Sequence, residues 1–136
     1  MSGNFFLDTN ILVYAYSNTD PMKSVQARAL NQPANGWIST QVLTELANVL
    51  NRKFKLGWPV VAVILEDITA SFPIHTNTPS TLLRATQVAQ RYGFSWFDSL
   101  IVAAALECGC QTLYSEDLQH AQALDNGLRV LNPFLV

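Results

Sequence analysis

The chain has 136 residues and a formal net charge of −2, and 49% of its residues are hydrophobic whereas only 13% are charged. This length predicts a single domain over residues 1–136, and the apolar content excludes an intrinsically disordered chain. The charge balance also excludes a protein that holds nucleic acid by a generally basic surface. A nucleic-acid ligand would therefore require a bound cation and a local basic patch.

Nothing in the sequence points to a membrane or to an oxidising compartment. Residues 1–10 lack the basic and apolar regions of a secretory signal, and the longest apolar runs are too short to span a bilayer. Cys108 and Cys110 are separated by one residue, a spacing that strains a disulfide, so we expect reduced thiols. The sequence therefore predicts a cytoplasmic protein that does not bind membranes.

Short apolar runs predict strands, and apolar residues at helical spacing after capping side chains predict helices. In chain order, we expect a strand at 5–7, helices at 11–16 and 21–30, a turn at 31–36, a strand at 37–39, a helix from a cap at 39 or 40 through 50, a helix at 60–71, a strand at 73–76, helices at 79–91 and 95–107, a strand at 111–114, a helix at 117–125 and a strand at 128–131. This alternation predicts an α/β fold: a three-layer α/β/α sandwich around a mostly parallel sheet of four to five strands.

Four acidic side chains lie where apolar strands give way to helices. Asp8 and Asp117 follow two predicted strands, Glu45 lies just inside the helix after another, and Asp98 opens a helix. In sheets of this kind, ligands bind outside the carboxyl ends of the strands. We therefore expect the four carboxylates to converge on one edge of the sheet.

Each of these acids also has a plainer explanation. Asp8 and Asp117 are good helix caps, Asp98 completes a capping-box-like pattern with Ser95, and Glu45 fits an exposed helix face. The joint pattern favours a site, because two like charges about 4 Å apart cost about 4 kcal/mol at an effective dielectric of about 20. Gathered carboxylates therefore favour a hard divalent cation such as Mg²⁺ or Mn²⁺. Without it, mutual repulsion is expected to raise their pKa values.

The chain resembles a known family in segments that occur in the same order. These segments are FFLDTNILVYAY, ISTQVLTELANVL, YGFSWFDSLIVAAALECGC, TLYSEDLQHAQ and LRVLNPF. They resemble PIN-domain proteins, and most of all the VapC-type toxin ribonucleases of bacterial type II toxin–antitoxin modules. The resemblance spans nearly the whole chain and is weakest at 58–80.

The resemblance implies a parallel α/β/α sandwich and an endoribonuclease site that holds one or two Mg²⁺ or Mn²⁺ ions. By motif, the catalytic and metal-binding acids are Asp8, Glu45, Asp98 and Asp117, with Glu45 either a ligand or a group that orients the attacking water. A metal-activated water would then hydrolyse the RNA phosphodiester. The supporting residues by motif are Thr9, Asn10, Ser39, Ser115 and Glu116.

The resemblance also implies partners: an RNA substrate, with transfer RNA as a candidate, a cognate antitoxin protein and a second copy in a homodimer. Arg52, Lys53 and Lys55 follow the Glu45 helix and are candidates for contacts with the RNA backbone. They equally fit a helix C-terminus whose dipole favours positive charge. We expect the antitoxin groove between 22–30 and 43–56.

Two other classes of enzyme share an Asp after the first strand of an α/β sheet. Phosphoaspartate receivers and aspartate-nucleophile phosphatases need a lysine late in the chain, and none follows Lys55; the phosphatases also need a second Asp where this chain has Asn10. The non-enzymatic alternative is a binding module whose acidic edge captures a basic segment of a partner. An antitoxin arginine could occupy the same acids.

Overall fold

The computed structural model describes residues 3–31 and 34–135. Within these residues, five strands form one sheet in the order β3-β2-β1-β4-β5, and every neighbouring pair is parallel. The strands are β1 (Phe5–Leu7), β2 (Gly36–Ser39), β3 (Ile74–His75), β4 (Thr112–Tyr114) and β5 (Arg129–Leu131). The α-helices are α1 (Thr9–Ala15), α2 (Pro21–Leu30), α3 (Thr40–Arg52), α4 (Trp58–Ser71), α5 (Pro79–Tyr92) and α6 (Trp96–Glu107).

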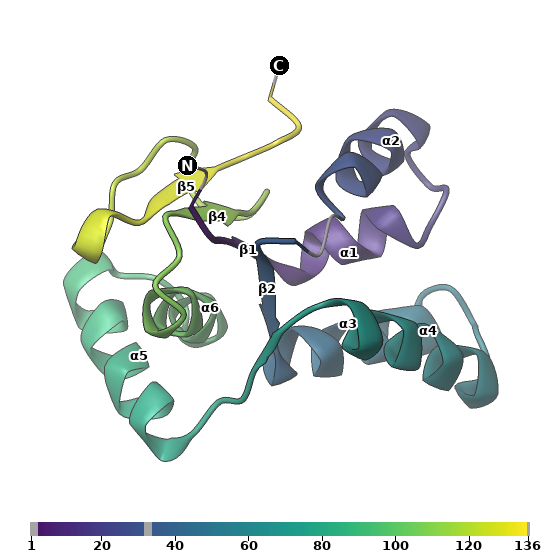
Figure 1. The fold of residues 1–136 in the computed structure, drawn as a ribbon, viewed down its shortest axis with the longest axis horizontal. Coiled ribbons are helices and arrows are strands. Elements are labelled where there is room, and N and C mark those ends of the chain that lie inside the picture. The colour runs from purple at the N-terminus through teal and green to yellow at the C-terminus, as the bar shows by residue number, and fades with distance from the viewer. Residues whose placement is uncertain (1–2, 32–33, 136) are drawn as a thin grey trace.

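Helices cover both faces of the sheet. In Figure 1, α5 and α6 lie on one side of the strands and α1 to α4 lie on the other. This arrangement confirms the predicted α/β/α fold with a parallel sheet. None of the helices in the described part of the chain combines the length and apolar composition needed to cross a bilayer.

The core forms from the strands and from the apolar faces of the helices. The strand residues Phe6, Ile38 and Leu113 are fully buried. Helix α6 is buried at every position from Ser99 to Leu106, because its sequence there is almost wholly apolar. The sheet and α6 together provide a rigid base for the side chains at their ends.

Helix α3 is amphipathic, and this decides where its polar groups point. Val42, Leu46 and Leu50 are fully buried at a spacing of one helical turn. Glu45 and Asn48 lie off this buried stripe and remain accessible. Residues on this polar side of α3 are therefore available to a site at the edge of the sheet.

The strand order places a crevice beside the central strand. The chain adds β2 and β3 on one side of β1, and then β4 and β5 on its other side. The carboxyl ends of β1 and β4 thus flank the point at which the direction of strand addition reverses. Open parallel sheets bind their ligands at such a point.

Every predicted strand is present, and so is every predicted helix before residue 117. Residues 32 and 33 of the predicted turn lie outside the described residues. Helix α4 begins earlier than predicted, because Gly57 caps it and Pro59 lies in its first turn. Proline fits that position, since its missing N–H has no helical partner there.

The predicted helix at 117–125 is wrong. The backbone of this segment pairs with β5 instead: the Ala121 N–H donates to the Val130 carbonyl at 2.8 Å, and the Val130 N–H donates to the Gln122 carbonyl at 2.9 Å. Pairing with a strand satisfies these backbone groups in the tertiary structure, so local helix propensity does not decide the conformation.

A tight turn then returns the chain into β5. Asp125–Gly127 forms a short 3-10 turn in which both Asn126 and Gly127 have positive φ. The Leu124 N–H donates to the Leu128 carbonyl at 2.7 Å across it. An Asp-Asn-Gly sequence between apolar residues is a turn signal, and it argues against a helix that runs into residue 125.

Ala121 adopts a left-handed backbone conformation, with φ of 66°. For a residue with a Cβ this costs about 1–2 kcal/mol, whereas glycine loses roughly 0.5–1 kcal/mol of conformational freedom. We expect Ala121→Gly to raise the free energy of unfolding by roughly 0.5–1 kcal/mol in urea denaturation. Ala123→Gly is the matched control: Ala123 pairs with Arg129 in an antiparallel bridge and should lose stability. Equal losses in both variants would contradict the left-handed conformation of Ala121.

Candidate metal centre

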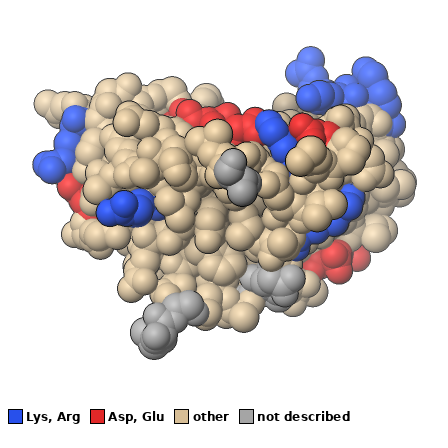
Figure 2. All heavy atoms as spheres, turned by 90° about the horizontal axis from the view of Figure 1, so that it is seen from above, with Lys and Arg blue, Asp and Glu red and all other residues tan. Residues whose placement is uncertain are grey.

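Three carboxylates meet at the edge of the sheet. Among the described residues, Asp8, Asp98 and Asp117 each offer an oxygen, and these oxygens all lie within 4.8 Å of one another. Asp8 follows β1, Asp117 lies shortly after β4, and Asp98 is in the first turn of α6. We call these three residues the acid cluster. Figure 2 shows acidic side chains gathered in a band along one edge of the molecule, with basic side chains beside them.

Asp8 is the buried member of the acid cluster, with 4% of its surface exposed. The Thr9 N–H donates to its Oδ1 at 2.7 Å, and the Ser115 hydroxyl donates to its Oδ2 at 2.8 Å. Burial raises the pKa of Asp8 to about 7; the two hydrogen bonds oppose the rise, and the charges of Asp117 and Glu45 add to it. The pKa is raised as predicted, but burial rather than repulsion is the main cause.

Asp117 is held by its neighbours in the loop after β4. Its N–H donates to the Ser115 hydroxyl at 3.1 Å, and Asn10 Nδ2 donates to its Oδ2 at 3.1 Å. Asn10 also accepts the Glu116 N–H at 3.3 Å through Oδ1. The Ser115 hydroxyl therefore links the carboxylate after β1 to the loop that carries the carboxylate after β4.

Asp98 reaches the acid cluster from the start of α6. Ser95 caps this helix, and its hydroxyl accepts the Asp98 N–H at 3.2 Å. Burial raises the pKa of the Asp98 carboxyl, the hydrogen bond with Ser95 lowers it, and the charge of Asp117 raises it further. Asp98 thus forms the expected capping contact and also turns its carboxylate toward Asp117.

Glu45 lies beside the acid cluster and is not one of its three members. Thr9 Oγ1 donates to Glu45 Oε1 at 2.5 Å, and Gln41 Nε2 donates to Oε2 at 3.3 Å. Gln41 also donates to the Phe97 carbonyl at 3.1 Å, so contacts from α1 and α6 fix the Glu45 carboxylate. Helical spacing places Gln41 on the same face of α3 as Glu45, but its contact with the Phe97 carbonyl of α6 has no signal in the sequence.

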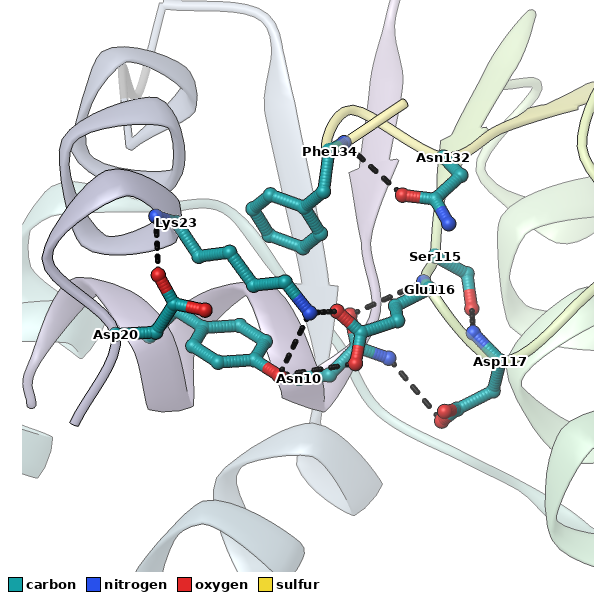
Figure 3. A network of polar contacts seen from close by, with 9 residues as sticks. Asn10, Asp20, Lys23, Ser115, Glu116, Asp117, Asn132 and Phe134 are labelled. Atoms are coloured by element: carbon teal, nitrogen blue, oxygen red, sulfur yellow. Dashed lines mark hydrogen bonds and ion pairs between the residues drawn. The ribbon is translucent and has the colours of Figure 1, made fainter. Parts of the chain in front are cut away.

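Glu116 turns away from the acid cluster. Its carboxylate accepts hydrogen bonds from Tyr14 Oη at 2.9 Å and from Lys23 Nζ at 2.8 Å. Lys23 also lies over the rings of Tyr14 and Phe134, at 5.0 and 5.4 Å from their centroids (Figure 3). Lys23 therefore neutralises Glu116, and sequence reasoning missed both Lys23 and Tyr14.

The remaining supporting residues divide into a cap and exposed cations. Ser39 is fully buried and accepts the Val42 N–H at 3.3 Å, so it starts α3. Lys53 lines the cavity that contains Glu45 and Asp117, whereas Arg52 and Lys55 are exposed and do not line it. Of the three predicted RNA contacts, only Lys53 lines the same cavity as Glu45 and Asp117.

The residues present fit a hard divalent cation. All three oxygens are carboxylate oxygens, and a cation favours the ionised form of the buried Asp8 against the cost of burial. Asp117 is exposed, which leaves one side of the acid cluster open to water and to a substrate. Mg²⁺ and Mn²⁺ suit such sites, because they retain several waters when few carboxylates bind them.

The raised pKa of Asp8 predicts how the metal-free protein responds to pH. The folded state binds a proton at Asp8 up to about pH 7, whereas the unfolded state loses it near pH 3.8. The stabilisation that neutral Asp8 gives is therefore complete below the pKa of Asp8 in the unfolded chain. It is lost as the pH rises through the pKa of Asp8 in the folded protein. We expect about 2–3 kcal/mol of unfolding free energy to disappear between about pH 5 and about pH 8.

Urea denaturation in EDTA at both pH values tests this, with Asp8→Asn as the reference. The asparagine is neutral at every pH, so the variant should lack this part of the pH dependence. The same pH dependence in both proteins would show that Asp8 titrates normally.

The Ser115 hydroxyl donates to Asp8 and accepts from the Asp117 N–H, so we expect it to affect metal binding. Ser115→Ala should weaken Mn²⁺ binding about 10–100-fold, as is usual when a group that orients metal ligands is removed. Titration calorimetry measures the affinity. Ser71→Ala is the control, since that hydroxyl bonds only the Asp67 carbonyl on α4 among the described residues. Unchanged affinity in Ser115→Ala would mean that the hydroxyl does not position the acids.

The chain is similar to a known protein family and to several solved structures. The PIN domain family model matches residues 5–124. No curated protein matches the sequence. Solved structures do match, at identities that show a shared fold. The structure of VapC20 from Mycobacterium tuberculosis, a toxin that cleaves the sarcin-ricin loop, has a TM-score of 0.69 and 22% identity, over 84% of this chain and 90% of that one.

Two further matches come from complexes. The toxin–antitoxin complex from Klebsiella pneumoniae has a TM-score of 0.71 and 19% identity, over 98% of this chain and 100% of that one. DNA-bound VapBC from Salmonella typhimurium has a TM-score of 0.66 and 18% identity, over 94% and 96%. Since the family model covers most of the sequence, the chain belongs to the PIN domain family.

Proposed function

We propose that this protein is a metal-dependent endoribonuclease that hydrolyses RNA phosphodiesters and acts as the toxin of a toxin–antitoxin pair. The observation that carries the proposal is the convergence of three carboxylate oxygens, within 4.8 Å, at the strand-order reversal of a PIN-family sheet. Like charges are gathered there at a cost that a divalent cation relieves.

Asp8, Asp98 and Asp117 would hold one or two Mg²⁺ or Mn²⁺ ions. When bound, such an ion neutralises charge that develops on the phosphate and lowers the pKa of water. Glu45 would act beside them: Thr9 occupies its Oε1 at 2.5 Å, whereas Oε2 has only a long contact with Gln41. Glu45 Oε2 would orient an attacking water and accept its proton.

Histidine-based cleavage has no support in this geometry. His75 contacts Asn77 and Glu107, and the His120 Nδ1 accepts the Asn132 N–H at 2.9 Å. Neither histidine is among the residues that line the cavity beside the acid cluster. Acid-assisted hydrolysis with a bound cation is therefore the chemistry that the local residues support.

A protein antitoxin is the proposed partner, because three of the similar solved structures are VapBC or toxin–antitoxin complexes. Helix α2 offers an apolar surface for it: Met22 is 78% and Val25 is 66% exposed, beside Pro21 and Gln26. A homodimer and a cytoplasmic location remain predictions. Transfer RNA remains a candidate substrate, and the relative that cleaves the sarcin-ricin loop adds ribosomal RNA.

Incubation of the purified protein with total RNA tests the proposal. With Mn²⁺ or Mg²⁺ we expect discrete fragments, which should be absent in EDTA. Asp98→Asn should lower the rate at least about 100-fold, since a lost metal ligand removes several kcal/mol of transition-state stabilisation. Glu66→Gln is the control, because Glu66 is an exposed acid on α4, away from the acid cluster.

A folded protein that neither cleaves RNA nor binds Mn²⁺ would contradict the proposal of a metal-dependent endoribonuclease. It would favour the alternative, in which the acidic edge captures a basic segment of a partner protein.

A further inference from the structure

A cavity of about 480 Å³ continues from the acid cluster. Glu45 and Asp117 line one end of it, together with Thr9 and Asn10, and its other residues come from α1, α3 and the loop after α1. Its volume lies within the about 300–1,000 Å³ of pockets that hold small organic ligands. The cavity is therefore large enough for a unit of the size of a nucleoside beside the proposed reaction site.

Apolar side chains line the cavity about one helical turn beyond Thr9 on α1 and beyond Glu45 on α3. Val13 of α1 and Val49 of α3 line it, together with Tyr14. The Tyr14 hydroxyl is held by Glu116, and its ring packs edge-on against Phe134 at 5.1 Å. Figure 3 shows the Lys23–Glu116 pair, with the Phe134 ring beside it. The cavity wall thus exists before any ligand binds, and a base would pack between aliphatic side chains rather than on an open aromatic face.

Two polar side chains line the cavity farther along α3 than Glu45: Asn48 lies about one turn on, and Lys53 lies just after the end of the helix. Lys53 lies over the Phe54 ring at 5.6 Å from its centroid, and none of the ion pairs among the described residues includes it. Lys23, in contrast, is paired with Glu116. The exposed Asn48 amide makes no hydrogen bond within the described part of the chain. A cation without an ion pair and an amide without a hydrogen bond therefore line this cavity.

We propose that this cavity is a nucleoside subsite that holds the residue adjoining the cleaved phosphodiester. Its base packs between Val13 and Val49, the Asn48 amide hydrogen-bonds the base edge or the ribose, and Lys53 pairs with the next phosphate along the strand. The proposal rests on the proposed function, because the cleaved phosphate must lie at the acid cluster.

The charge order favours RNA over a basic peptide as the occupant. Glu45, Val49 and Lys53 follow one another at intervals of about one turn along and just after α3. A cation at the acid cluster, the apolar Val49 and the Lys53 ammonium would therefore match the order phosphate, nucleoside, phosphate. An arginine-bearing segment would suit the acids but would bring its own positive charge near the unpaired Lys53. The cavity is thus complementary to two successive phosphates of one strand.

Cleavage kinetics on a short oligoribonucleotide test the two named side chains. Asn48→Ala and Lys53→Gln should each raise KM roughly three- to tenfold, the loss of one hydrogen bond, while kcat changes less. Lys53→Gln should also lower the slope of log kcat/KM against log salt by about 0.7, as for one lost phosphate contact on a single strand. Asn48→Ala should leave that slope unchanged but alter the preferred base beside the cut.

The controls remove the same chemical groups elsewhere. Arg129→Gln removes a cation at the start of β5, and Gln90→Ala removes an exposed amide on α5; neither residue lines the cavity. Both variants should keep the wild-type KM and salt slope.

A nucleotide-binding experiment distinguishes failure of the nucleoside subsite from failure of the proposed ribonuclease function. Nucleoside 3′- and 5′-monophosphates are titrated into metal-free protein, and NMR shifts are followed at the Asn48 amide and the Val13 and Val49 methyl groups. Shifts at these groups that Asn48→Ala weakens support the subsite, even in a protein that does not cleave RNA, where only the proposed function fails. Absence of these shifts, together with unchanged kinetics of both variants in an active enzyme, overturns the subsite and leaves the cavity to a protein partner.

Discussion

The buried carboxyl group of Asp8 is the constraint on which the rest of the site depends. It lies where the two central strands end, and it is almost inaccessible to water. A carboxylate in that position is costly unless hydrogen bonds and a nearby positive charge stabilise its ionised form. The Thr9 N–H and the Ser115 hydroxyl supply the hydrogen bonds, and together they join the end of β1 to the loop after β4. The positive charge is what the acid cluster lacks, and this is the physical reason to expect a cation there.

The same loop sorts two adjacent acids into different roles. Glu116 and Asp117 are neighbours in the sequence, yet Lys23 and Tyr14 bind the first while Asn10 orients the second toward Asp8 and Asp98. Neutralising Glu116 removes one negative charge from the neighbourhood of an already crowded acid cluster. The same network joins α2 and Phe134 to the Tyr14 ring that lines the cavity, so packing, charge and the shape of the site depend on one network.

Much of this arrangement could be predicted from the sequence, for identifiable reasons. Asp8 and Asp117 follow apolar strands, and parallel strands bring their carboxyl ends to one edge, so their convergence follows from topology. The sequence also predicts Glu45 at this edge, but not that it lies beside the acid cluster instead of within it, because that depends on the Thr9 hydroxyl reaching across from α1. The loop after Asp117 was predicted as a helix, because pairing of its backbone with β5 leaves no local trace in the sequence. The partner of Glu116 is 93 residues away, beyond any spacing rule.

The net charge of the chain affects how strongly this site would attract RNA. A protein of net charge −2 has no overall electrostatic attraction for a polyanion, and its acidic edge repels one. In the proposed ribonuclease, a bound divalent cation would reverse the local sign, but only after the buried Asp8 has released its proton, because metals bind the ionised carboxylate. Cation, proton and RNA would then be linked at one carboxyl group: a higher pH would favour the ionised form, the ionised form would favour the cation, and the cation would make the edge attractive to phosphate. Activity that falls on acidification below about pH 7, and that added metal restores, would follow from this linkage alone.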